Sequence, residues 1–103
     1  MSRSYGHNIL LTLQKADGDR LGVKLGRLCV EANLPASYVA KALEVSRISL
    51  YNWFKGKGIR EEKRKVIEVF IDLVNEDMKN GTLPAANVVA AKLYIESLIG
   101  VPI

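Results

Sequence analysis

Apolar residues recur every three or four positions along most of the chain, which is the period of an α-helix rather than of a strand. Turn and capping residues divide this pattern into separate elements. The helices predicted in this way run over Asp19 to Asn33, Ala36 to Leu43, Ser46 to Phe54, Glu61 to Lys79 and Thr82 to Ile99. Tyr5 to Ala16 also has helical spacing, but its apolar run would suit a strand equally. The predicted fold class is all-α.

Caps and apolar stripes define how these helices should lie. Asp19 and Ser46 are expected as N-caps, and Gly56 and Gly58 should break the chain before the long helix that begins at Glu61. The inward stripe expected on that long helix consists of Val66, Ile67, Phe70, Ile71, Val74 and Met78.

Two short helices separated by a very short turn, Ala36 to Leu43 and Ser46 to Phe54, must cross steeply. Ala40 supplies the small side chain that such a crossing needs. The residues whose spacing turns them toward a shared core are Val39, Leu43, Val45, Leu50 and Trp53. The residues expected on the opposite, outer face of the second helix are Arg47, Ile48, Tyr51 and Asn52.

The stretch from Ala36 to Gly56 resembles the helix-turn-helix of the lambda-repressor-like (Cro/CI) DNA-binding family, most closely at Asn52-Trp53-Phe54-Lys55-Gly56. With the flanking helices, the resemblance covers about Asp19 to Val74. It implies a compact helix-turn-helix bundle of about five helices, here with an added C-terminal apolar helix. Glu44 departs from the pattern, because the family usually has glycine there. A left-handed turn at Glu44 would cost about 1 kcal/mol.

The resemblance also implies roles for individual residues in double-stranded DNA binding. The expected base contacts are Arg47, Ile48, Tyr51 and Asn52; an arginine can pair with both acceptors of guanine, whereas Ile48 can only pack on a thymine methyl. The expected phosphate contacts are Ser37, Ser46, Ser49, Lys55, Lys57, Arg60, Lys63 and Arg64. Ser37 could instead simply cap its helix, and each basic residue could be merely solvated.

The charge distribution agrees with this interpretation. The chain carries a formal net charge of +4, but between Arg47 and Lys65 seven basic residues stand against two acidic ones. A basic block in an otherwise nearly neutral chain is typical of a surface that contacts nucleic acid. A solvated helix face would look the same in the sequence.

Composition and candidate chemistry exclude several classes of protein. Hydrophobic residues make up 49 % of the 103 residues, which is enough for one folded domain. One cysteine, Cys29, and one histidine, His7, permit neither an internal disulfide nor a zinc cage, and Cys29 on an apolar helix face is expected to be a packed thiol. We therefore expect no catalytic residues, no metal and no cofactor. The N-terminus lacks the apolar core of a signal peptide and the sequence has no apolar run long enough for a membrane span, so the expected location is the cytoplasm, with nucleoid association if the protein is bacterial or from a phage.

The C-terminal segment suggests assembly, because eleven of the fifteen residues from Ala85 to Ile99 are apolar. One small domain can hardly cover so wide a face, so we expect it to supply both core and a homodimer contact. The residues expected in these roles are Val88, Val89, Leu93, Tyr94, Ile95, Leu98 and Ile99. A helix packed wholly within its own chain is the alternative.

Together these features predict a dimeric, sequence-specific transcriptional regulator, most simply a repressor that reads an inverted repeat. The expected organisation is a single domain with an N-terminal extension (1–18), a DNA-binding core (19–81) and a dimerisation helix (82–103). The alternatives on the same motif are a DNA-packaging small subunit and an antitoxin whose C-terminal helix binds another protein. An interaction module that has lost DNA binding is the alternative from another class.

Overall fold

The computed structural model describes residues 5–103, and this part of the chain forms α-helices without any strand. The first four residues of the expected N-terminal extension lie outside the described range. The helices are α1 (His7–Lys15), α2 (Leu21–Glu31), α3 (Ala36–Ala42), α4 (Arg47–Phe54), α5 (Glu61–Lys79) and α6 (Val88–Ile99). The all-α prediction is therefore confirmed, and four of the helices, α2 to α5, coincide closely with predicted helices.

The ambiguous first segment is a helix, α1, because its apolar residues match a helical face. Leu13 is buried and Ile9 and Leu10 are half-buried, whereas Leu11 is exposed. A strand would have placed Ile9, Leu11 and Leu13 together on one face. Tyr5, just before α1, inserts into the core, and its hydroxyl donates a hydrogen bond to the carbonyl oxygen of Leu34.

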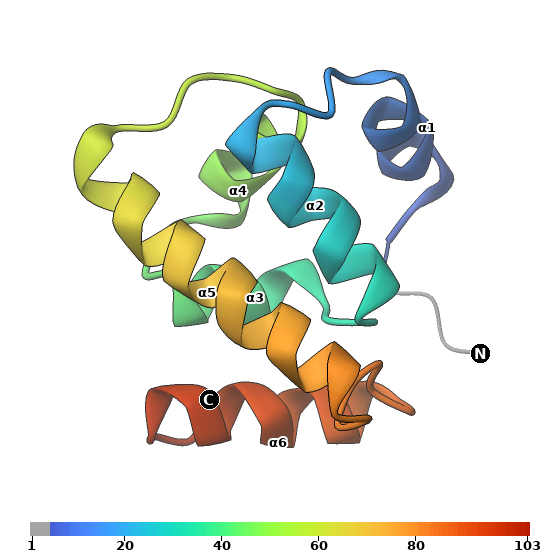
Figure 1. Cartoon of the computed structure of the whole chain (residues 1–103), viewed down its shortest axis with the longest axis vertical. Coiled ribbons are helices and arrows are strands. Elements are labelled where there is room, and N and C mark those ends of the chain that lie inside the picture. Colours follow the sequence, from blue (N-terminus) through green and yellow to red (C-terminus); the bar gives the residue numbers. More distant parts are fainter. Residues whose placement is uncertain (1–4) are drawn as a thin grey trace.

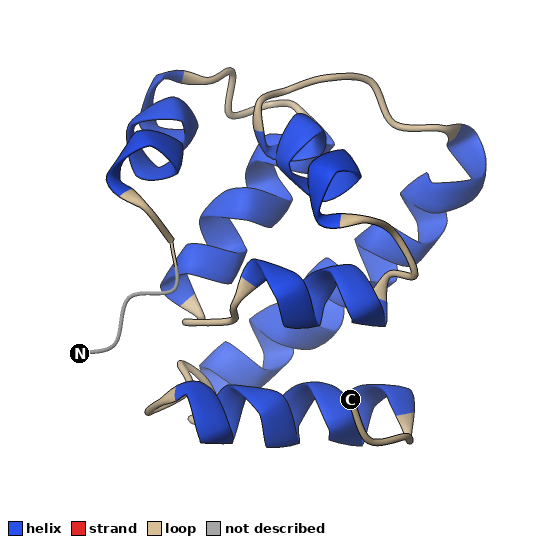
Figure 2. Ribbon diagram, turned by 180° about the vertical axis from the view of Figure 1, so that it is seen from behind, coloured by secondary structure: helices blue, strands red, loops and turns tan. Residues whose placement is uncertain are grey.

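The helices form two sides of one compact body (Figures 1 and 2). In Figure 1, α2 and α5 lie toward the viewer, whereas Figure 2 shows α3 and α4 at the front of the opposite side, with α6 below α3. The body measures 30 × 29 × 25 Å, with a radius of gyration of 12.6 Å, close to the ~13 Å expected for a single domain of this length. One hydrophobic core includes residues of all the described helices, so α1 and α6 are packed parts of the same unit.

Two glycines of α2 allow α4 to lie directly against it. A Cβ on Gly22 would sit only 2.6 Å from the carbonyl carbon of Trp53, and one on Gly26 would meet ring atoms of Phe54 at 2.9 Å. Trp53 and Phe54 are themselves buried, as the sequence predicted for Trp53. The inner face of α4 is thus held by backbone contact with α2, and its outer face is turned away from the core.

The predicted N-cap of α2 is wrong. Arg20 occupies the N-cap position, and the carboxylate of Asp17 accepts a 3.0 Å hydrogen bond from the amide of Asp19. The Asp17 side chain thus stabilises the turn before the helix, and no aspartate side chain caps the first helical turn. At α4 the prediction is confirmed, because the Ser46 side chain accepts a hydrogen bond from the amide of Ser49 at 3.1 Å.

The last helix begins later than the pattern predicted, at Val88 instead of Thr82. The preceding segment is fixed to the α2–α3 junction: the amide of Ala85 donates to the carbonyl of Ala32 at 2.9 Å, and Asn33 Nδ2 donates to the carbonyl of Ala85 at 2.8 Å. Asn87 then caps α6 by accepting from the amide of Ala90 at 2.8 Å. Apolar Leu83 and Ala85 are buried by this loop rather than by a helix.

The predicted stripe of α5 contains one error. Ile67, Phe70 and Val74 are buried and Ile71 and Met78 are partly buried, as expected, but the side chain of Val66 is 45 % exposed. Ile67 lies near the centre of the buried stripe, and Val66 is about 100° away from it around the helix, so the side chain of Val66 falls at the edge of the stripe.

Candidate nucleic-acid interface

The α3–α4 pair has the internal packing that its sequence predicted. Val39, Leu43 and Leu50 are almost fully buried. Ala40 is also buried, and its small side chain takes up little room between the two helices. Val45, in the turn, is partly buried against the same core. The two short helices therefore pack as one unit, and the start of the outer face of α4 is left exposed.

The turn between α3 and α4 adopts a left-handed conformation at Glu44, with φ at +57°. Two backbone hydrogen bonds close it: the amide of Val45 donates to the carbonyl of Ala40 at 3.0 Å, and that of Glu44 to the carbonyl of Lys41 at 3.2 Å. This pair of bonds is a Schellman motif, which usually has glycine at the left-handed position. The turn therefore forms in spite of the unusual residue.

The outer face of α4 presents a polar and an apolar side chain side by side at its start. Arg47 is exposed, and Ile48 is 76 % exposed, which is unusual for so large an apolar residue. Asn52, one turn later, is half-buried. The exposure of Arg47 and Ile48 agrees with the outer face that the sequence predicted, whereas Asn52 is only partly exposed.

Tyr51 is less available than its neighbours. Its ring is half-buried and meets the ring of Phe54 edge-on, with 5.8 Å between ring centroids and an 88° angle between planes. The ring therefore packs on the body, and only part of the side chain faces outward.

The expected phosphate-contacting residues are in different environments. Lys55, Lys57 and Arg60 are exposed on the segment between α4 and α5, and Arg64 is half-buried. Lys63 is partly engaged within the protein, because its Nζ donates to the carbonyl of Leu43 at 3.0 Å. This hydrogen bond joins the start of α5 to the end of α3.

The three serines also differ. The Ser46 hydroxyl accepts from the amide of Ser49 and donates to Ser49 Oγ at 3.1 Å, so its proton is already used. Ser37 does not occupy the N-cap of α3, which is Pro35. The capping alternative for Ser37 is thus not what the structure shows, and its hydroxyl sits half-buried in the first turn of α3.

One basic residue near the motif was not singled out from the sequence. Lys41 is exposed in the last turn of α3, three residues before the left-handed Glu44. Its positive charge and its place inside the motif could have identified it from the sequence. It lies outside the run from Arg47 to Lys65 on which the charge argument was based.

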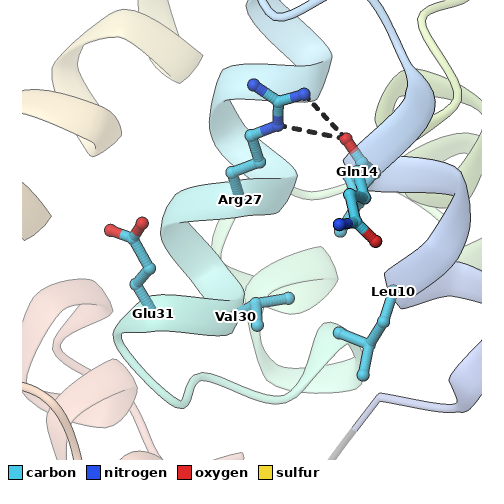
Figure 3. Close-up of a pocket in the computed structure, with 6 residues that line it drawn as sticks. Leu10, Gln14, Arg27, Val30 and Glu31 are labelled. Carbon is cyan, nitrogen blue, oxygen red and sulfur yellow. Dashed lines mark hydrogen bonds between the residues drawn. The ribbon is translucent and has the colours of Figure 1, made fainter.

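A shallow hollow between α1 and α2, with a volume of about 220 Å³, lies outside this interface. Its lining residues are Leu10, Leu13, Gln14, Arg27, Val30 and Glu31 (Figure 3). The guanidinium of Arg27 donates to the carbonyl of Leu13 through Nε at 3.1 Å and Nη2 at 2.9 Å, and to that of Ala16 at 3.1 Å. Arg27 is therefore occupied in holding the end of α1.

Cys29, the side chain considered as a nucleophile, is part of the hydrophobic core. Cys29 is fully buried, and burial raises the pKa of its thiol to about 12, although a hydrogen bond with Tyr5 acts in the opposite direction. A thiol in this environment is a poor nucleophile. Within residues 5–103, no three His, Cys, Asp or Glu side chains gather in a way that could hold a metal ion. In the same range no helix has the length and apolar character needed to cross a membrane.

The expected assembly residues on α6 divide into two groups. Ile95 is fully buried, Leu98 and Ile99 are partly buried, and the Tyr94 hydroxyl donates to Asp77 Oδ2 at 2.6 Å. The side chains of Val88, Val89 and Leu93 are 43 %, 67 % and 60 % exposed. The first group packs α6 onto its own chain, and the second group is the more exposed of the two.

Comparisons with known proteins add no relative, because no family model, no curated protein and no solved structure matches the chain. The interpretation of the site therefore depends on its geometry and chemistry.

Proposed function

We propose that the protein is a sequence-specific, double-stranded-DNA-binding transcriptional regulator that inserts α4 into the major groove. The observation that carries the proposal is the outer face of α4, where exposed Arg47 and Ile48 follow a capped, rigid turn and the rest of the helix is fixed on α2. The major groove, about 12 Å wide, admits one α-helix, and arginine is the residue that most often reads guanine there.

Two further observations support the proposal. The departure from the family pattern at Glu44 leaves the left-handed turn in place, so it does not count against a helix-turn-helix. The exposed Lys55, Lys57 and Arg60 directly follow α4 in the chain, where phosphates beside the groove would pass. Phosphate neutralisation by such residues supplies sequence-independent affinity and orients the reading helix.

We further propose that the regulator is a homodimer that reads an inverted repeat, with Val88, Val89 and Leu93 of α6 in the dimer contact. Val89 and Leu93 are four residues apart and so lie on one face of α6, exposed to a degree that is costly for aliphatic side chains. Ile95 is fully buried and the Tyr94 hydroxyl donates to Asp77 of the same chain, so we do not include these two residues in the proposed contact.

Selection of duplexes from a random pool by the full chain tests the function. The proposal predicts enrichment of an inverted repeat. The logarithm of the binding constant should fall linearly with the logarithm of the salt concentration, with a slope of about −0.9 for each phosphate neutralised. Lys55→Glu combined with Lys57→Glu should weaken binding to all duplexes alike. No enrichment together with no duplex binding at low salt would contradict the proposal and favour an interaction module.

A further inference from the structure

Ile48 is the most exposed large apolar side chain within residues 5–103. It is 76 % exposed and takes no part in the hydrophobic core. It is the second residue of α4, at the end of the helix whose side chains meet base edges when a helix-turn-helix lies in the major groove. Figure 2 shows α4 at the front of the molecule, on the side that also holds α3. The free protein therefore leaves this branched aliphatic side chain in water.

The apolar surface at Ile48 is one side chain among polar ones. Arg47 and Ser49, its neighbours in the chain, are exposed, and Asn52, one turn further along the same face, is half-buried. Val45, one turn earlier, is partly buried against the core. A single aliphatic contact surrounded by hydrogen-bonding groups suits one methyl group on a polar surface better than the apolar patch of a protein partner.

The base edges in the major groove offer one apolar group. Thymine carries a methyl at C5, whereas the other groups by which the base pairs differ there are hydrogen-bond donors and acceptors. Cytosine has only hydrogen at C5, but 5-methylcytosine carries the same methyl on the same ring carbon. The side chain of Ile48 cannot form hydrogen bonds, so it cannot sense the exocyclic oxygen of thymine or the amino group of 5-methylcytosine. Its contact therefore separates methylated from unmethylated pyrimidines, and not thymine from 5-methylcytosine.

We propose that Ile48 reads a 5-methylpyrimidine, so that methylation of a cytosine at this position creates a binding site for the protein. The inference rests on the proposed function, because it requires α4 in the major groove, and it adds a chemical state of the DNA to the sequence that is read. Arg47 precedes Ile48 by one residue, a rise of about 1.5 Å along the helix. The methylated base therefore lies next to the guanine with which Arg47 is proposed to pair.

Duplexes that differ by one methyl group in each half-site test the proposal in anisotropy titrations at about 0.15 M salt. In the site selected by the full chain, each thymine is replaced in turn by deoxyuridine opposite the same adenine. At the position read by Ile48, this replacement should weaken binding about fourfold for each half-site, the effect of one buried methyl group. A cytosine–guanine pair is then placed at that position with and without the C5 methyl, and the methylated duplex should bind tighter by the same factor.

Two variants of Ile48 separate the methyl contact from other effects of methylation. Ile48→Ser should bind methylated and unmethylated duplexes equally, because it removes the aliphatic side chain. Ile48→Val keeps a branched aliphatic side chain and should retain most of the preference. Ile48 is mostly exposed, so both variants should fold, and urea unfolding checks that they do.

A methyl preference that persists in Ile48→Ser would overturn the proposal, because a change in DNA shape would then carry the effect. A selected site without thymine, equal affinity for thymine and deoxyuridine at every position, or equal affinity for cytosine and 5-methylcytosine would overturn it as well. In these cases a chain that still prefers the selected duplex to a random one retains the proposed function. A chain that binds no duplex at low salt loses both.

Discussion

Lys63 reaches from the first turn of α5 to the end of α3, where its Nζ donates a 3.0 Å hydrogen bond to the carbonyl oxygen of Leu43. Leu43 is the C-cap of α3, so this carbonyl has no partner within the helix. A positive charge is also favourable at the negative end of a helix. Lys63 therefore helps to hold the turn that positions α4, whatever it contributes to phosphate binding.

Lys63→Met should lower the free energy of unfolding by about 1–2 kcal/mol, because the carbonyl of Leu43 loses its charged donor in a partly buried hydrogen bond. Lys65→Met, on the exposed side of the same turn, is the control and should change it by less than about 0.5 kcal/mol. Urea unfolding measures both. Equal losses in the two variants would show that the Lys63 hydrogen bond adds nothing to stability.

Glu44→Gly should raise the free energy of unfolding by about 1 kcal/mol, because glycine adopts the left-handed conformation without the strain of a Cβ. Glu44→Ala removes the same carboxylate but keeps the strain, so it should bring no such gain. The comparison again uses urea unfolding. A glycine variant no more stable than the alanine variant would argue against strain at this turn.

Much of this fold could be predicted because local signals and tertiary packing agree. Ser46 caps α4 as predicted, and α5 begins at Glu61 and ends at Lys79 where acidic residues and a glycine punctuate the chain. At Asp19 and Thr82 the local signals were misleading. Asp17 stabilises the turn before α2, and the segment at Ala85 is held by Ala32 and Asn33, both more than fifty positions away in the sequence.

The candidate site was predictable to the same extent. The outward direction of Arg47 and Ile48 follows from helical periodicity and is seen in the structure. The packing of Tyr51 on Phe54 and the bond from Lys63 to Leu43 depend on where other elements lie, so periodicity carried no signal for them. Val66 was assigned to the core because it is apolar, although its side chain is 45 % exposed in the structure.

Stability should fall at alkaline pH because the folded state holds the protons of Tyr5 and Cys29 tightly, in addition to that of Tyr94, whose pKa is raised by burial and by Asp77. Burial raises the pKa of Tyr5 far above its ordinary value, with nearby Cys29 adding to the effect, and burial raises the pKa of Cys29 to about 12. As the pH rises above about 9, the unfolded chain loses these protons first, so the free energy of unfolding decreases. Below that pH, both groups are protonated in both states and the contribution is constant.

The variant Tyr5→Phe measures how much of this alkaline decrease in the free energy of unfolding comes from Tyr5. Above about pH 10 the slope of the unfolding free energy should be shallower by about 1.4 kcal/mol per pH unit, one proton's worth. At neutral pH the variant should be less stable by about 1–3 kcal/mol, because the carbonyl of Leu34 loses its donor. Identical slopes in the two proteins would contradict the assignment of the pH effect to Tyr5.

Val89→Glu with Leu93→Lys should convert a dimer into a folded monomer. Both side chains are mostly exposed, and glutamate four residues before lysine favours the helix, so α6 should stay intact. Light scattering measures the mass, and Val69→Ser with Leu73→Ser on α5 is the control that should remain dimeric. A wild-type protein that is already monomeric at tens of micromolar, or a charged variant that stays dimeric, would contradict the α6 contact.

The central claim is that α4 reads base sequence, and Arg47→Ala tests it most directly. Titration of this variant against the selected duplex and a random duplex should show a loss of about 1–3 kcal/mol on the selected site and almost none on the random one, because a base contact contributes discrimination that a phosphate contact does not. Lys57→Ala, the exposed control, should lose the same amount on both duplexes. Equal losses on both duplexes for Arg47→Ala would contradict base reading by α4.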